Sequence, residues 1–492
     1  MNDFEAFKEK TRSANVVPVV DTLPADLLTP LAVYLKLSAG STNSFLLESV
    51  EGGETLARYS FVGVDPEFVV SGNDSRVLVL SEAGSVEFDS GLIEYLRTHF
   101  AKKRVHHDES LPSFIGGAIG SMNFDCSSWF EPTLKKGVET DDVSSLMFFR
   151  SIVAFDHAKQ VISIISLVFT NEAEENGVGL ADLFAAAQSC NGKLRASLET
   201  GNIPLPPANS DRHPEPPTSN WDKVSFEAAV DEIKEMINAG EAYQVVISQC
   251  FSKPTPASPI AIYRAIRSLN PSPYMFLIKF GERSVIGASP EMLVRVRGGD
   301  LEYRPIAGTR PRGKTAEEDV RLAEEMKADR KEVAEHLMLV DLGRNDLGRV
   351  AEYGSVRVDS LMHVEKYSHV QHLVSRLSAK LREGLDQFDA LASCFPAGTV
   401  SGAPKVRAIE IIRSLEPTPR GIYAGAVGYF DYAGNMDTCI AIRTLTLENG
   451  VAKVQAGAGI VADSIPESEF QETVNKARAM IKAIEIAEKN SI

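Results

Sequence analysis

Six short apolar runs, rich in β-branched and aromatic residues, dominate the first 200 residues and most constrain the fold. Gly, Asn and Asp separate them, as is typical of successive β-strands. A helix predicted over 181–198 closes this half of the chain. The predicted strands cover 44–47, 59–62, 68–70, 77–80, 147–155 and 161–167.

The pattern changes after the Pro-rich, polar segment 201–220. Apolar residues at helical spacing predict a helix over 225–239, and a strand is expected over 243–251. Thr315 and Glu318 form a capping-box pair, Asp329 starts another helix, and 466–489 predicts a long final helix. Strands and helices mix without regular βαβ alternation, which predicts an α+β fold.

We therefore expect an N-terminal region over 1–200, a linker over 201–220 and a second region over 221–492. The short strands of the first region are expected to share a composite core with the second region.

Charge and cysteine usage exclude several classes of protein. A net charge of −16 argues against nucleic-acid and anionic-membrane surfaces, so an anionic ligand needs a local cluster of cations and N–H donors. The polar N-terminus has no signal-peptide core, and no apolar run is long enough to span a membrane. The five cysteines form no CxxC pair, which favours a reducing, cytoplasmic location.

Acidic residues on two predicted helices suggest a magnesium site. Glu469, Glu472 and Lys476 share one helical face, and Glu335 lies on another helix. Mg²⁺ prefers a few carboxylates completed by water and substrate oxygens. The alternative is a solvated, charged helix face.

Two loops combine glycine, hydroxyl and basic residues, as anion-binding loops do: PIAGTRPRG (305–313) and FPAGTVSGAPK (395–405). The glycines of AGAGIV (456–461) permit close approach of a ligand to the backbone. The alternatives are ordinary turns and a β-bulge. Arg443 lies in the apolar run CIAIRTLTL, where a buried guanidinium must be paired and suits a carboxylate. His369 and His372 are three residues apart, and each is a catalytic candidate or an ordinary core histidine.

Nine motifs in one order resemble the chorismate-utilising enzyme family over about 225–487. They are SPEMLVRV, PIAGTRPRG, EHLMLVDLGRND, HVQHLVSR, FPAGTVSGAPK, GIYAGAVG, AIRT, AGAGIV and EFQETVNK. The resemblance implies antiparallel sheets packed as a sandwich with helices outside and the N-terminal region intertwined. It also implies a magnesium-dependent lyase.

The resemblance also implies roles for individual residues. His372, rather than His369, matches the family's histidine because Leu373 follows it. The implied catalytic residues are His372, Glu291 and Thr309. The implied magnesium ligands are Glu335 and Glu472, with Glu469 close by. The implied chorismate-binding residues are Ala307, Gly308, Thr399, Tyr423, Arg443, Gly457, Ala458, Gly459 and Lys476.

Two positions indicate the nucleophile. Members that add water carry a lysine base where this chain has Gln244, and members that form 4-amino-4-deoxychorismate carry a lysine where it has Ala307. Ammonia needs no base to attack. The anthranilate-forming branch, which begins tryptophan biosynthesis, is therefore expected. The alternatives are aminodeoxychorismate synthesis and a non-catalytic, tryptophan-binding sensor.

Ammonia is expected from a separate glutamine amidotransferase subunit, because no cysteine has a glycine-flanked nucleophile setting. LLES (46–49) and RYSFVG (58–63) resemble the N-terminal region of the anthranilate-forming members. With NPSPYMF (270–276), LLES implies a site for L-tryptophan as feedback inhibitor; the alternative is ordinary packing. The implied regulatory residues are Glu48, Ser49, Pro271, Pro273, Tyr274 and Met275.

Overall fold

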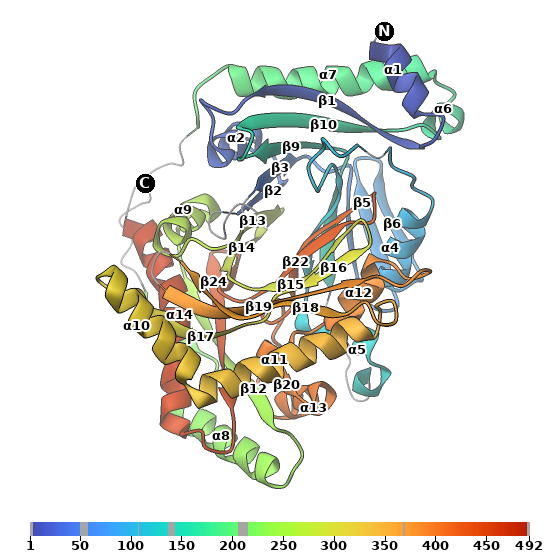
Figure 1. Ribbon diagram of the computed structural model, residues 1–492. Coiled ribbons are helices and arrows are strands. Elements are labelled where there is room, and N and C mark those ends of the chain that lie inside the picture. Colours follow the sequence, from blue (N-terminus) through green and yellow to red (C-terminus); the bar gives the residue numbers. More distant parts are fainter. Residues whose placement is uncertain are drawn as a thin grey trace.

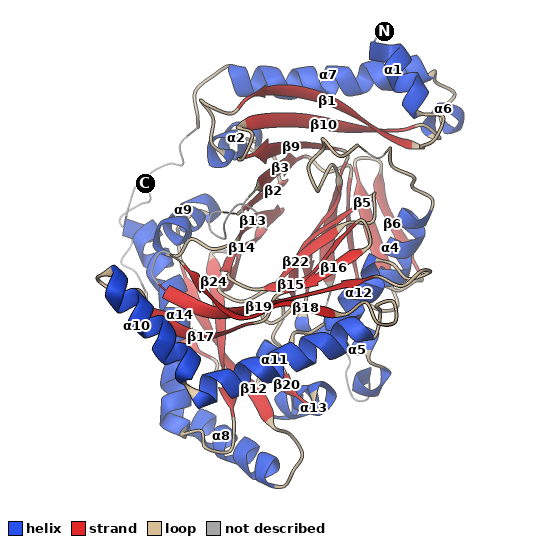
Figure 2. Cartoon of the chain, in the orientation of Figure 1, coloured by secondary structure: helices blue, strands red, loops and turns tan. Residues whose placement is uncertain are grey.

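The computed structural model describes residues 3–49, 58–106, 108–135, 143–204, 215–367 and 370–489. These residues form two large antiparallel sheets of twelve strands each, flanked by helices (Figures 1 and 2). The α+β sandwich expected from the sequence is confirmed. Among the described helices, none has both the length and the apolar character needed to cross a membrane.

Sheet 1 begins with strands of the N-terminal part and ends with strands of the C-terminal part. Its order is β1 (Val16–Pro24), β10 (Val161–Phe169), β9 (Ser151–Asp156), β3 (Tyr59–Val64), β2 (Asn43–Glu48), β13 (Tyr274–Phe280), β14 (Arg283–Ser289), β23 (Thr444–Glu448), β24 (Val451–Ile460), β12 (Gln244–Pro254) and β11 (Thr218–Ser219), with β20 (Gly402–Ala403) paired to β12.

Sheet 2 also joins the two parts of the chain. Its order is β17 (Ile306–Pro311), β19 (Val370–Lys380), β16 (Asp300–Tyr303), β15 (Met292–Arg297), β22 (Met436–Ile440), β21 (Ala426–Asp431), β7 (Gly117–Met122), β8 (Ser144–Phe149), β4 (Phe68–Gly72), β5 (Val77–Ser81) and β6 (Gly84–Phe88), with β18 (Arg357–Lys366) paired to β19. The pairs β2·β13 and β7·β21 join early strands to late ones. The predicted intertwining is confirmed.

Helices cover the outer faces of the sandwich (Figure 1). The α-helices are α1 (Asp3–Lys10), α2 (Pro30–Leu37), α4 (Leu92–Ala101), α5 (Ser127–Phe130), α6 (Glu172–Glu175), α7 (Leu180–Glu199), α8 (Lys223–Asn238), α9 (Pro259–Leu269), α10 (Ala316–Ala328), α11 (Arg330–Gly348), α12 (Gln387–Cys394), α13 (Lys405–Leu415) and α14 (Pro466–Lys489). Short 3₁₀ turns occur at Phe124–Cys126, Pro132–Lys135 and Gly398–Val400.

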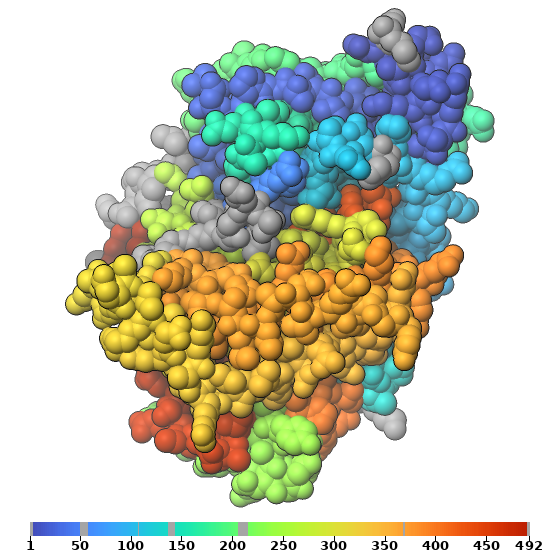
Figure 3. Space-filling view, in the orientation of Figure 1, coloured from blue at the N-terminus to red at the C-terminus, as the bar shows by residue number. Residues whose placement is uncertain are grey.

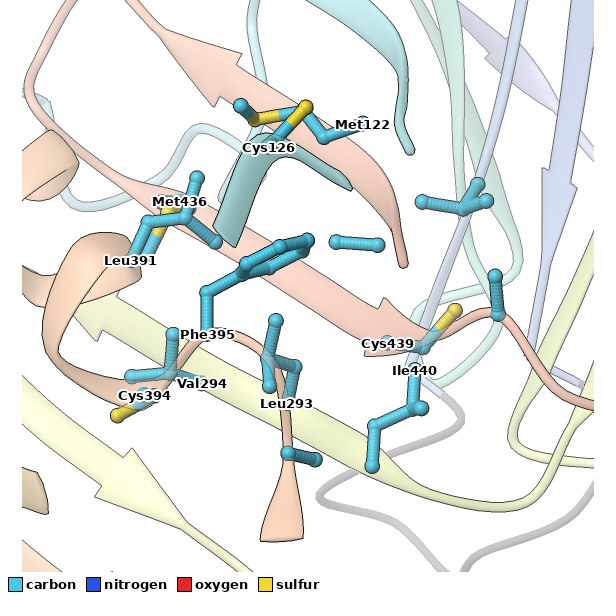
Figure 4. Packing of buried hydrophobic residues seen from close by; sticks show 14 of the residues in the cluster. Met122, Cys126, Leu293, Val294, Leu391, Cys394, Phe395, Met436, Cys439 and Ile440 are labelled. Atoms are coloured by element: carbon cyan, nitrogen blue, oxygen red, sulfur yellow. The ribbon is translucent and has the colours of Figure 1, made fainter. Parts of the chain in front are cut away.

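Strand alternation divides the apolar residues between two cores. Phe45 of β2 belongs to the core between the sheets, whereas its neighbour Leu46 belongs to the core beneath α2, α9 and α14. Figure 4 shows part of the inter-sheet core, where Phe395 lies among Met122, Leu391 and Met436. Both cores are contiguous across the two parts of the chain.

The helix starts follow the predicted capping residues. Asp329 caps α11 by accepting hydrogen bonds from the N–H groups of Lys331 and Glu332. Thr315 caps α10 through the N–H of Glu318. The reciprocal half of the predicted capping box is wrong, because the Glu318 carboxylate accepts from the N–H of Lys314 instead.

The single strand predicted over 147–155 is wrong. The chain forms β8 in sheet 2, turns at Arg150 and continues as β9 in sheet 1. Arg150 marks the turn, where its guanidinium pairs with Glu67 and Glu172. Both strands have apolar, buried residues, so the sequence pattern does not change where the chain leaves one sheet for the other.

Candidate active site

A cavity of about 850 Å³ lies where β12 and β24 of sheet 1, β17 and β19 of sheet 2, and helices α11 and α14 meet. We call it the main cavity, and its size suits a small-molecule ligand. The layer formed by α10, α11, β18 and β19 runs in yellow and orange across one face of the molecule (Figure 3), and α11 supplies one wall of the cavity. The predicted residues that line it are Glu291, Ala307, Gly308, Thr309, Glu335, His372, Thr399, Tyr423, Arg443, Gly457, Gly459, Glu469, Glu472 and Lys476.

Two crossings of the chain between the sheets supply Glu291 and Arg443. Glu291 lies between β14 of sheet 1 and β15 of sheet 2, and Arg443 lies between β22 of sheet 2 and β23 of sheet 1. The crossings are hydrogen-bonded to each other, because the N–H of Ala288 donates to the carbonyl of Arg443 at 3.0 Å. Arg443 has a φ of +50°, a conformation that non-glycine residues rarely adopt. The apolar run CIAIRTLTL is thus interrupted at the cavity.

Glu291 has the electrostatic properties of an acid. Burial raises the pKa of its carboxyl group to about 8, and the nearby Thr399 hydroxyl opposes that rise. Glu291 is therefore largely protonated at neutral pH and can donate a proton. The Thr399 oxygen is itself buried without a well-formed hydrogen bond to the described residues, so it can accept or donate a bond to a ligand.

His372 has the properties of a base. Its Nδ1 lies 3.0 Å from the carbonyl oxygen of Gly308 and 3.0 Å from the hydroxyl of Thr309. Because a carbonyl oxygen can only accept, Nδ1 carries the hydrogen in the neutral ring, which leaves Nε2 free to accept a proton. Burial lowers the pKa of His372, so the ring is neutral at physiological pH.

Glycines open the floor of the cavity beside polar groups. A Cβ atom at Gly457 would lie 2.7 Å from the Tyr423 hydroxyl oxygen and 2.9 Å from the Ile247 carbonyl oxygen. One at Gly459 would lie 2.4 Å from Nε2 of Gln244. Ala458 points to the opposite face and is buried, so it does not line the cavity by its side chain.

Cationic groups stand beside this floor. Nζ of Lys476 donates to the carbonyl of Gly457 at 3.0 Å and pairs with Glu472 at 2.7 Å. Arg443 donates to the carbonyl of Lys476 at 3.4 Å. Burial lowers the pKa of Arg443, and Tyr423 opposes that effect. Two cations beside a glycine-lined floor, in a chain with a net charge of −16, indicate a site for an anionic ligand.

Three glutamates face the cavity from two helices, Glu335 from α11 and Glu469 and Glu472 from α14. Burial raises the pKa of Glu335, with Glu332 and Glu472 adding to the rise. Burial also raises the pKa of Glu469, again with a contribution from Glu472. Within the described ranges, no three His, Cys, Asp or Glu side chains are close enough to form a complete metal site. The donor set fits a cation that shares its coordination with a ligand and water.

Lys331 and Gln244 are among the cavity residues that received no binding or catalytic role from the sequence. Lys331 lines the cavity from the first turn of α11 and lowers the pKa of both Glu335 and Glu469. The sequence signal that could have identified Lys331 is its spacing of four residues from Glu335, which places both side chains on one face of the helix. Gln244, the position used to choose the nucleophile, also lines the cavity. His369 lies outside the described residues.

A second pocket collects most of the predicted regulatory residues. Glu48, Ser49, Pro273, Tyr274 and Met275 line it, whereas Pro271 does not. We call it the Glu48 pocket. Glu48 accepts hydrogen bonds from the Tyr263 hydroxyl and, at 3.2 Å, from Arg267. Its other walls are Arg58, Tyr59, Phe61, Arg295, Arg297, Tyr429, Asp437 and Cys439.

Comparisons with known proteins identify the family of the chain. The family model described as chorismate binding enzyme matches residues 42–482. Anthranilate synthase component 1 of Acetivibrio thermocellus is 44% identical over 98% of this chain and 97% of its own length. The Bacillus subtilis protein of the same name is 39% identical over 99% of this chain and 96% of its own length.

Solved structures give the same result. The crystal structure of anthranilate synthase component I from Streptococcus pneumoniae superposes with a TM-score of 0.75 at 36% identity, covering 93% of this chain and 98% of that one. The menaquinone-specific isochorismate synthase of Escherichia coli, at 21% identity, shares the fold with a TM-score of 0.70, covering 98% of this chain and 99% of that one. The chain belongs to the chorismate binding enzyme family and, within it, groups with the anthranilate synthase component 1 proteins.

Proposed function

We propose that the chain catalyses the synthase half of the anthranilate synthase reaction, in which chorismate and ammonia give anthranilate and pyruvate. The observation that carries this proposal is the pairing of a protonated acid, Glu291, with a neutral base, His372, on one cavity. The reaction needs both groups, since a hydroxyl group must leave and a ring proton must be removed.

The substrate is a dianion, and two sets of groups suit its two carboxylates. Arg443 and Tyr423 bind the enolpyruvyl carboxylate. Lys476 and the backbone of Gly457 and Gly459 bind the ring carboxylate. Thr399 lies against the ring, and Ala307 and Gly308 line the side of the cavity next to His372.

Mg²⁺ is the proposed cofactor. Glu335 and Glu472 would hold it, with Glu469 close by; burial raises the pKa of Glu335 and Glu469 and repulsion from Glu472 adds to the rise, which supports a cation there. When bound, the ion would supply Lewis-acid stabilisation of developing negative charge, and because the reaction eliminates pyruvate, the proposed enzyme is a magnesium-dependent lyase.

The protein residues then act in two steps. Glu291 donates its proton to the C4 hydroxyl, which leaves as water while ammonia adds at C2, and the added ammonium group loses one proton to give 2-amino-2-deoxyisochorismate. Nε2 of His372 removes the C2 proton, with Thr309 and Gly308 fixing the ring through Nδ1. The C3–O bond breaks as the ring becomes aromatic, and the departing enolate takes up a proton to give pyruvate. No base is needed to activate ammonia, consistent with Gln244 and Ala307 in place of lysines.

A separate glutamine amidotransferase subunit is the proposed source of ammonia. Burial raises the pKa of the Cys250 thiol and raises that of Cys394 to about 12, the opposite of what a nucleophilic thiol requires. The five cysteines are free thiols, which supports a reducing, cytoplasmic location.

L-Tryptophan is the proposed feedback inhibitor, bound in the Glu48 pocket. The pocket offers aromatic walls for an indole and both acidic and guanidinium groups for a zwitterionic amino acid. The Ser49 hydroxyl is buried there without a hydrogen-bond partner among the described residues. We assign 1–200 to a regulatory and structural region, 201–220 to a linker and 221–492 to the catalytic region.

Fluorescence of the purified chain with chorismate, ammonium and Mg²⁺ tests the proposal. Anthranilate emission that disappears with a chelator is the expected result. Consumption of chorismate without anthranilate would instead indicate aminodeoxychorismate formation. No consumption would leave the chain as a non-catalytic tryptophan sensor.

A further inference from the structure

Hydrogen bonds among Ser289, Glu291 and Ile440 hold the crossing that carries Glu291, and they include a long bond of 3.4 Å from the Ser289 hydroxyl to the Glu291 carbonyl. The Ser289 hydroxyl donates to the carbonyl of Ile440 at 2.7 Å. The N–H of Ile440 donates to the carbonyl of Glu291 at 3.1 Å, and the N–H of Glu291 donates to the Ser289 oxygen at 3.3 Å. The backbone of Glu291 is thus fixed on both sides, and Ser289 is fully buried.

Ser289 also lies between two walls of the Glu48 pocket. On one side it is directly opposite Tyr274 in the β13·β14 pair, so both side chains lie on the same face. On the other side its hydroxyl interacts with the Cys439 thiol and opposes the rise in pKa that burial causes there. Tyr274 and Cys439 both line the Glu48 pocket. Figure 4 shows Cys439 and Ile440 pointing to opposite sides of β22.

We propose that Ser289 is a positioning residue that fixes Glu291 in the main cavity and couples its position to occupation of the Glu48 pocket. Of the two pockets, Glu291 lines the main cavity, and Tyr274 and Cys439 line the Glu48 pocket. The Ser289 hydroxyl interacts with the Glu291 backbone and the Cys439 thiol, and Ser289 is the cross-strand neighbour of Tyr274. A ligand in the Glu48 pocket that moves Tyr274 or Cys439 therefore shifts Ser289 and, with it, the backbone of Glu291.

A small movement is enough to affect the reaction, because an acid misplaced by about 1 Å can cost about 10²-fold in rate. Burial gives Glu291 its protonated state, so a crossing that moves toward water also lowers its pKa. Among the described residues, the other titratable or charged groups near it are the Tyr303 hydroxyl of β16 and, around the main cavity, Tyr243, Lys331, Glu335, His372, Tyr423, Arg443, Asp463, Glu469, Glu472 and Lys476.

The coupling rests on the proposed function, and the test separates the two. Wild-type chain is first assayed for anthranilate with chorismate, ammonium and Mg²⁺, and a silent wild type would overturn the proposed function before any variant is compared. Ser289→Ala is then expected to lower kcat by about 10- to 100-fold with little change in KM for chorismate. In the pH profile of this variant, the fall in kcat on the alkaline side should occur at a lower pH than in the wild type. Calorimetry should show that it still binds L-tryptophan, while tryptophan inhibits it less.

Ser284→Ala is the matched control, since Ser284 is a buried serine on the same strand that lines neither pocket. It should behave as wild type. Ser289→Thr keeps the hydroxyl and should recover most of the lost turnover; this variant also carries the test if Ser289→Ala does not fold. The proposal is overturned if Ser289→Ala keeps the wild-type kcat and alkaline limb, or if its inhibition follows tryptophan binding as in the wild type.

Discussion

Glu291 and Arg443 occupy two neighbouring crossings of the chain between the sheets, joined by the hydrogen bond from Ala288 to the Arg443 carbonyl. One residue is a buried acid and the other a cation, and both line the main cavity. The sandwich therefore places an acid and an anion-binding group at the point where its two layers exchange strands.

The pH dependence of kcat should report the ionisation of Glu291. Its pKa is raised to about 8, and only the protonated form can donate, so kcat is expected to fall as pH rises through about 8. Glu291→Gln should lower kcat by about 10²- to 10⁴-fold and abolish that limb. Initial rates of anthranilate formation, measured at about two pH values per pH unit from about pH 6 to about pH 10, give the profile. An unchanged alkaline limb in the variant would exclude Glu291 as the acid.

The acid limb should report His372. Because burial lowers its pKa, the neutral ring persists below the ordinary histidine range, and activity should fall only at lower pH. His372→Ala should lower kcat by about 10²- to 10⁴-fold. Thr309→Val removes one partner of Nδ1 but leaves the Gly308 carbonyl, so its loss should be about tenfold or less. Equal losses in the two variants would contradict this division of roles.

The two glycines of the cavity floor should respond differently to alanine. At Gly457 the new Cβ would meet the Ile247 carbonyl at 2.9 Å, which is rigid backbone, whereas at Gly459 it would meet the end of the flexible Gln244 side chain. Gly457→Ala should therefore raise KM for chorismate by about tenfold or more, and Gly459→Ala by much less. Steady-state kinetics of the two variants decide, and the reverse order would show that the floor is not built as described.

The dependence of activity on Mg²⁺ concentration should distinguish the cavity glutamates from a glutamate elsewhere on α14. Glu335→Gln and Glu472→Gln should each raise the half-saturating Mg²⁺ concentration by about tenfold or more, since each removes a charged ligand. Glu485→Gln, near the far end of α14, is the control and should leave it unchanged. Titration of the activity with Mg²⁺ gives the answer. Identical Mg²⁺ curves for Glu335→Gln and the wild type would remove Glu335 from the site.

The source of ammonia can be tested with the chain alone. It should form anthranilate from chorismate and ammonium salts but not from glutamine, because its buried thiols have raised rather than lowered pKa values. Addition of a glutamine amidotransferase subunit should confer glutamine use. Glutamine-dependent anthranilate formation by the pure chain would show that the glutaminase site is internal.

Local signals in the sequence predicted the local structure well. Asp329 and Thr315 cap their helices, and the strands expected near 44–47 and 161–167 form β2 and β10. The single strand predicted over 147–155 was wrong because both strands are apolar and almost continuously buried, so the apolar run does not show the bend between them.

The candidate site, too, was predictable from the sequence only in part. Motifs with a resemblance to a family pointed to residues that gather in one cavity, including His372 and Glu472 from distant elements. Lys331 was missed because a lysine in the first turn of a helix is usually a surface residue. The hydrogen bonds that join Ser289 and Glu291 to Ile440 were not predictable, since they link residues about 150 positions apart through strand order, which local pattern does not specify.

The position of β24 has a consequence for how the chain folds during its synthesis on the ribosome. This strand lies between β23 and β12, and β21 and β22 lie between β7 and β15. Both sheets therefore remain incomplete until the residues of these late strands have left the exit tunnel. Earlier strands such as β1 and β10 can pair during synthesis, but the cavity itself is completed only after almost the whole chain has been translated. A nascent chain released early would expose unpaired strand edges, which makes premature termination a route to aggregation rather than to a smaller working enzyme.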